Sequence, residues 1–86
     1  MKMIVAILKD IDNDAVTQGL TAEGFRVTRI ATTGGLFKKG TATLFVGVDD
    51  DKVEAAINVM RDKTTSVSGE KRCTVFVVPV ERFEQL

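Results

Sequence analysis

Hydrophobic and polar positions follow two different periodicities along this chain of 86 residues. Residues 3–8 and 75–80 are short, continuous apolar runs rich in isoleucine or valine, a pattern typical of strands that are covered on both faces. Residues 25–32 and 41–48 also have the length and composition of strands. The pattern therefore predicts four strands, of which the last spans 73–80.

A helical periodicity predicts a first helix between the first two strands. The acidic segment 12–14 offers N-caps, and the helix runs to about Glu23 with Val16 and Leu20 as its apolar anchors. Gly24 is placed to end it as a C′ residue.

A second helix is predicted from an apolar stripe at positions 53, 56, 57 and 60, whose spacing of 0, 3, 4 and 7 is that of one helix face. Three aspartates at 49–51 precede the stripe, and Asp51 with Glu54 matches a capping box. We interpret these acids as helix caps and partners of the helix dipole. The acids at 10–14 are also interpreted as caps and not as metal ligands, because the glycine and glutamate of a calcium loop are missing.

The resulting order, β-α-β-β-α-β, is that of the α+β ferredoxin-like fold, in which a four-stranded antiparallel sheet carries two helices on one face. A single domain over residues 1–86 accommodates all of it. The first and last strands are nevertheless apolar on both sides, and no helix remains to cover the second face. We therefore expect a homo-oligomer whose sheets pack together.

The amino-acid composition disfavours several classes of function. The 12 basic and 12 acidic residues balance, which gives no indication of a nucleic-acid or membrane partner. There is no histidine, and Cys73 is the only cysteine, so an enzyme, a metal site and a disulfide are all disfavoured. Such cysteine usage suits a reducing compartment, and we expect a cytoplasmic protein.

The segment 32–41 is the most informative part of the sequence. Its three glycines, at 34, 35 and 40, let a ligand approach the backbone, and Lys38 and Lys39 add positive charge. It is not a P-loop, because Thr41 stands where that motif has lysine. The segment is either a plain hairpin connection with solvated lysines or part of a binding site. The bulky apolar pair Leu36–Phe37 favours the second interpretation.

Nearby residues extend the candidate site. Arg26 and Thr28 share one side of the strand that leads into this segment, and Gly47 interrupts the next strand, as glycines do where a ligand approaches the backbone. An arginine, a hydroxyl group, glycine amides and an aromatic ring together suit a phosphorylated purine.

The sequence resembles the PII-like cyclic di-AMP receptors, the DarA/PstA family, over nearly its whole length. The similarity lies in M-K-M-I-V-A-I at 1–7, G-F-R-V-T at 24–28, A-T-T-G-G at 31–35 and T-V-F-V-V-P-V at 74–80 with Phe83. It implies a PII-like homotrimer with inward-facing sheets, which is a signal-transduction protein and not an enzyme.

The resemblance also implies a ligand, cyclic di-AMP, bound in three clefts between subunits, with no other cofactor and with a downstream protein partner that it does not name. Carried over residue by residue, the site comprises the following positions: Arg26, Thr28, Gly35, Leu36, Phe37, Thr41, Gly47 and Phe76.

Three features depart from the family pattern. The bulky pair usually reads Phe-Leu but here is Leu36–Phe37, Thr41 replaces an asparagine, and only residues 64–71 remain of a long loop before the last strand. These departures keep an alternative open, in which a divergent PII-like trimer has lost cyclic di-AMP binding and senses another nucleotide or acts as a protein-interaction module.

Overall fold

A computed structural model describes residues 1–30, 40–65 and 69–86 of the chain. The four strands are β1 (Lys2–Lys9), β2 (Arg26–Ile30), β3 (Thr41–Val48) and β4 (Cys73–Pro79). The helices are α1 (Asn13–Ala22) and α2 (Val53–Lys63), each preceded by a short 3₁₀ turn, Asp10–Asp12 and Asp50–Lys52. The predicted order of elements is thus confirmed.

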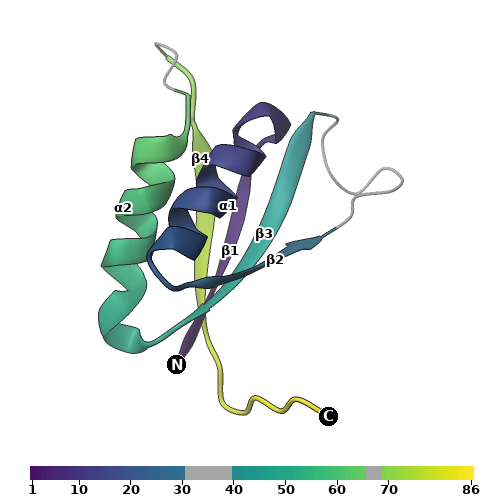
Figure 1. Ribbon diagram of the computed structural model, residues 1–86, viewed down its shortest axis with the longest axis vertical. Helices are drawn as coiled ribbons and strands as arrows, with labels where there is room; N and C mark the ends of the chain where they lie inside the picture. The colour runs from purple at the N-terminus through teal and green to yellow at the C-terminus, as the bar shows by residue number, and fades with distance from the viewer. Residues whose placement is uncertain (31–39, 66–68) are drawn as a thin grey trace.

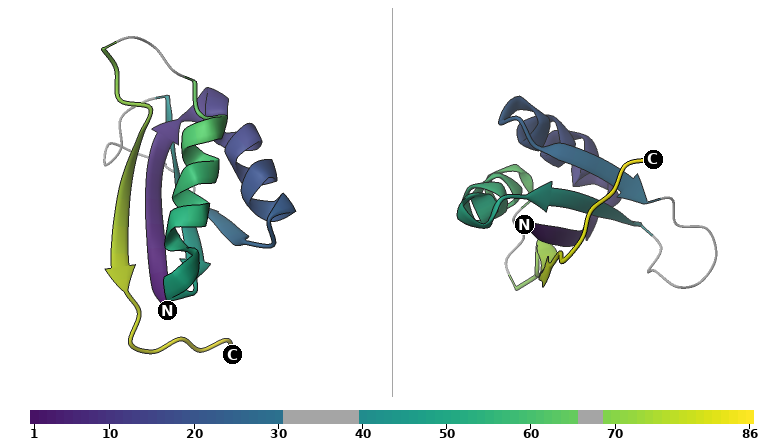
Figure 2. Two further views of the ribbon diagram at one scale, coloured as in Figure 1. Left: turned by 90° about the vertical axis from the view of Figure 1, so that its left-hand side faces the viewer. Right: turned by 90° about the horizontal axis from the view of Figure 1, so that it is seen from below.

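The strands form one antiparallel sheet in the order β2-β3-β1-β4, with β1 and β3 in the centre (Figure 1). Both helices lie on the same side of this sheet (Figure 2). The other side, called the open face below, carries no helix of the described residues. The ferredoxin-like α+β prediction, with two helices on one face, is confirmed.

Alternation along the central strands determines which side chains enter the core. Ile4, Ala6 and Leu8 of β1 are buried, as are Ala42, Leu44, Val46 and Val48 of β3. All of these except Ala42 form one core cluster with Val16 and Leu20 of α1 and with Ala56 and Met60 of α2. The core therefore lies between the sheet and the helix layer. The predicted stripe of α2 faces it.

The open face remains partly uncovered. Val5 and Ile7 of β1 point to it and are half-buried, while Phe76 of the edge strand β4 is 54% exposed. An isolated chain leaves this apolar surface in contact with water, which is unfavourable.

The end of α1 agrees with prediction, since Gly24 follows the last turn with a φ of +89° and its N–H donates to the Thr21 carbonyl at 3.0 Å. The acidic residues before α2, in contrast, do not cap that helix as predicted. Asp51 lies inside the 3₁₀ turn Asp50–Lys52, Lys52 holds the N-cap position of α2, and no side chain caps that helix. The capping box predicted for Asp51 and Glu54 is therefore wrong.

Asp12 holds the N-cap position of α1, but its carboxylate serves another purpose. It is 95% buried and accepts two hydrogen bonds from Thr65, one from the hydroxyl at 2.6 Å and one from the backbone N–H at 3.0 Å. The segment that follows α2 is thus tied to the turn before α1.

Candidate functional site

The ladder between β2 and β3 sets the positions of the predicted site residues on these strands. Arg26 pairs with Gly47, and Thr28 pairs with Phe45. Val27, between Arg26 and Thr28, points the other way and packs against the core. Because side chains alternate across a strand, Arg26 and Thr28 share the open face with Phe45 and Gly47.

These residues line an open groove of about 920 Å³. Arg26, Thr28 and Gly47 all contribute to it, so the structure brings together three of the residues that the sequence singled out. The groove also receives the chain segment that follows β4, including Arg82, Phe83 and Gln85. Its size is within the range of small-molecule sites.

Gly47 lies between Arg26 of β2 and Met3 of β1 in the sheet. A Cβ atom built at this position would meet only the end of the Met1 side chain, at 3.2 Å. The backbone of β3 is therefore exposed toward the groove at this point. A ligand can lie directly on it, as the interruption of the strand by glycine indicated.

The groove contains charges of both signs. Arg26, Lys52 and Arg82 are its cations, and Glu23 and Asp49 are its acids. Arg82 is paired with Glu84 at 2.8 Å. Arg26 forms no ion pair with any residue that the structure describes. Its guanidinium is thus available for a phosphate, which arginine can bind through two parallel hydrogen bonds.

Aromatic surface lies close to these charges. Phe25, Phe45 and Phe83 line the same groove, and Phe83 is 62% exposed. Flat aromatic rings stack on all nucleobases, with little specificity for one base over another. The groove therefore combines an arginine that is unpaired among the described residues, a hydroxyl group, exposed backbone and aromatic rings.

Of the other predicted site residues that the structure describes, Thr41 and Phe76 do not line this groove. Gly35, Leu36 and Phe37 lie outside the described residues. Thr41 pairs with Lys9 at the far end of β3, six residues or about 20 Å from Gly47 at the usual rise of a strand. Phe76 pairs with Val5 on the edge strand. A single chain therefore does not bring Thr41 or Phe76 to Arg26.

The family model for cyclic-di-AMP receptors matches residues 1–72. This chain belongs to the cyclic-di-AMP receptor family. The resemblance described from the sequence is thereby confirmed, and it assigns the protein a role in binding and signalling.

A solved structure supports the fold of this receptor. The crystal structure of a functionally unknown protein from Pediococcus pentosaceus ATCC 25745 is similar to it, with a TM-score of 0.79 and 23% sequence identity. The match covers 99% of this chain and 96% of the other. At this identity the likeness shows a shared fold.

The described part of the receptor has neither a metal-binding cluster nor a helix that could cross a membrane. Within those residues no group of three or more His, Cys, Asp or Glu side chains is placed to hold a metal ion. The described helices, α1 and α2 among them, are all too short or too polar to span a bilayer.

Several residues that line the groove of the receptor were not predicted as site residues from the sequence. Phe45 could have been predicted, because it lies two positions before Gly47 and alternation along a strand places both residues on the same side. Arg82, Phe83 and Gln85 follow the last strand in an irregular segment, where no periodicity indicates which side chains face the sheet. The bond from the Val80 N–H to the Met1 carbonyl, at 3.1 Å, directs this segment past the groove.

Proposed function

We propose that this receptor is a cytoplasmic PII-like signal-transduction protein that binds cyclic di-AMP between the subunits of a homotrimer. The observation that carries the proposal is the meeting of Arg26, Thr28 and Gly47 in one groove on the open face. Their positions are those at which the family resemblance expects ligand contacts. The role is to bind and to signal, and no catalytic step is assigned.

The chemistry of the ligand suits these residues. A cyclic dinucleotide has two phosphates and two purines, so its site must combine positive charge with flat apolar surface. Arg26 binds a phosphate, and Thr28 donates or accepts a hydrogen bond. Gly47 gives access to the backbone, while the groove phenylalanines lie against a base.

The remaining predicted residues enter the proposal through the assembly. Gly35, Leu36 and Phe37 belong to the segment that follows β2, and the resemblance assigns them to the same ligand. Thr41 and Phe76 lie away from the groove of their own chain. In a cleft between two copies, residues that are distant within one chain can contact one ligand.

The trimer is supported by the half-uncovered apolar open face. Burial of one whole sheet face is typical of an obligate interface. Multi-angle light scattering at micromolar concentration is expected to give about 28 kDa, three times the chain mass of 9.4 kDa. A stable 9.4 kDa species would contradict the assembly.

Calorimetric titration with cyclic di-AMP, cyclic di-GMP and ATP tests the ligand. We expect saturable heat with cyclic di-AMP alone. Heat with one of the other two would reassign the groove to a different nucleotide. Silence with all three would contradict nucleotide binding and leave a trimeric interaction module, the alternative that Thr41 and the short segment 64–71 keep open.

A further inference from the structure

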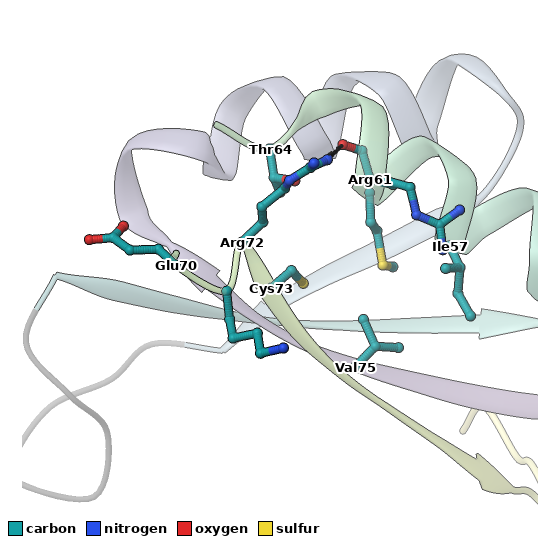
Figure 3. Close-up of a pocket in the computed structure, with 9 residues that line it drawn as sticks. Ile57, Arg61, Thr64, Glu70, Arg72, Cys73 and Val75 are labelled. Carbon is teal, nitrogen blue, oxygen red and sulfur yellow. Dashed lines mark hydrogen bonds between the residues drawn. The ribbon is translucent and has the colours of Figure 1, made fainter. Parts of the chain in front are cut away.

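A second pocket, of about 330 Å³, lies between the end of α2 and the start of β4 (Figure 3). Its floor is apolar and consists of Ile57 and Met60 from the helix and of Cys73 and Val75 from the strand. Burial of the Cys73 thiol raises its pKa to about 11, so the floor is uncharged at neutral pH. The volume is at the lower limit for ligand pockets and suits one apolar side chain.

This pocket is separate from the groove that contains Arg26. Cys73 pairs with Leu8 and Val75 pairs with Ala6, and the side chains of Leu8 and Ala6 are buried beneath the helices. The pocket therefore opens on the helix side of the sheet, and the two linings have no residue in common. An occupant here leaves the open face free.

The rim of the pocket is positively charged. Arg61, Lys71 and Arg72 surround it, and none of them forms an ion pair with a described residue. The one acid of the rim, Glu70, is already paired with Lys9 at 2.7 Å. Among the described residues, three cations with no acidic partner thus surround an apolar floor.

Hydrogen bonds hold two of these cations in place. The Arg61 guanidinium donates to the Asn58 side-chain oxygen at 2.8 Å. The Arg72 guanidinium donates to the Arg61 carbonyl at 3.2 Å, as Figure 3 shows. Neither bond neutralises the positive charge. The rim therefore keeps its positive charge while two of its side chains are restrained.

β4 forms an edge of the sheet, and within the described residues it pairs only with β1. Its outer backbone groups run past the pocket, with Val77 41% exposed farther along the strand. Free edges accept extended segments of other proteins, where main-chain hydrogen bonds give affinity and side-chain pockets give specificity.

We propose that the free edge of β4 and the adjoining pocket bind an extended, acidic segment of a partner protein. One leucine or phenylalanine side chain of the segment occupies the pocket against Val75, and its acidic neighbours pair with Arg61, Lys71 and Arg72. The segment adds to the sheet as a fifth strand. The charge of the rim selects the acidic sequence, and the size of the pocket selects the anchor.

The test uses the full chain, labelled with ¹⁵N, and an acetylated heptapeptide with one leucine between two sets of three glutamates. We expect amide shifts at Cys73, Val75 and Arg61, whether or not cyclic di-AMP is present. Affinity is expected to fall when salt is raised from 50 to 500 mM, because exposed charges are then screened. A peptide with alanine in place of leucine is expected to bind about tenfold more weakly, since it buries less apolar surface.

Matched charge reversals identify the site. Lys71→Glu replaces an exposed lysine of the rim, and it is expected to weaken peptide binding about three- to tenfold, the effect of losing one ion pair and adding one repulsion. Lys2→Glu makes the same change at the opposite end of the sheet, beside Pro79, and is expected to bind like the parent.

Four outcomes would overturn the proposal. The first is equal peptide binding by the Lys71→Glu variant and the parent, and the second is equal binding of a lysine-flanked peptide. The third is an oligomeric state that changes with Lys71→Glu in sedimentation without peptide, which would assign the edge to a second copy of this chain. The fourth is displacement of the peptide by octanoate at lower concentration, which would make the pocket a site for a small amphiphile. None of these depends on whether cyclic di-AMP binds.

Discussion

Arg26 lies directly opposite Gly47 in the β2–β3 ladder, with both residues on the open face of the sheet. The pairing places a cation without an ion-pair partner among the described residues beside backbone that carries no side chain of its own and that only the end of Met1 approaches. One residue can bind the charge of a ligand while the other lets it approach. This relationship is the basis of the first two predictions.

Replacement of Arg26 by alanine is expected to weaken cyclic di-AMP binding by about 1.5–3 kcal/mol, or roughly 10- to 150-fold, because a charge-assisted contact is lost. Arg29→Ala is the matched control. Arg29 belongs to the same strand, but it pairs with Leu44 and forms an ion pair with Asp10 at 3.2 Å. Calorimetry is expected to give the control the affinity of the parent, and equal affinity for all three proteins would exclude Arg26 from the site.

Replacement of Gly47 by valine is expected to reduce binding at least tenfold with little effect on the fold. Valine suits a strand, and the first atom that its Cβ meets is the movable end of Met1, at 3.2 Å. Thermal unfolding checks the fold, and titration checks the ligand. An unchanged affinity would mean that the ligand does not lie on this part of β3.

The fold could be predicted because its elements depend on local patterns. The stripe of α2 and the apolar runs of β1 and β4 are patterns within short segments. They can be recognised whatever sequence lies on either side of them. Gly24 ends α1 for a local reason as well, since glycine adopts its positive φ without strain. Such features require no knowledge of what packs against them.

The capping box failed for a local reason, since a 3₁₀ turn places Lys52 at the N-cap of α2, whereas other failures involve contacts between distant parts of the chain. Asp12 looks like a helix cap in sequence, but its partner is Thr65, 53 residues away. Phe83 reaches the groove because the backbone of Val80 is bonded to that of Met1. Arg26 and Thr28 were identified because alternation and family resemblance agreed, whereas nothing local could have indicated Phe83.

The contact between Asp12 and Thr65 leads to a prediction about stability. Asp12→Ala leaves the Thr65 hydroxyl and N–H without their acceptor, and is expected to lower the free energy of unfolding by about 1–3 kcal/mol. Asp14→Ala is the control, because Asp14 is an exposed acid in the first turn of the same helix and contributes about 0.3–1 kcal/mol through the helix dipole. Urea denaturation measures both. If both variants lose the same free energy of unfolding, the hydrogen bonds of Asp12 with Thr65 contribute nothing beyond the effect of an acidic charge near the helix N-terminus.

Cys73 gives the receptor a specific dependence on alkaline pH. Burial raises the pKa of its thiol from 9.0 to about 11, so the folded protein keeps a proton that the unfolded chain loses first. Between these values the unfolded state binds fewer protons, and stability therefore falls as pH rises. The contribution is complete below about pH 9 and is lost as the pH passes 11.

The Cys73→Ala variant isolates this effect, because lysines titrate in both proteins and the chain contains no tyrosine. The free energy of unfolding of the parent, minus that of the variant, is expected to decrease steadily from pH 8 to pH 11. Urea denaturation at intervals of half a pH unit measures the difference. The thiol is also expected to react slowly with Ellman's reagent at pH 8 until urea unfolds the protein, since thiolate is the reactive form. A constant difference across this range, with a thiol that reacts equally fast before and after unfolding, would show that Cys73 is exposed to water in the folded protein.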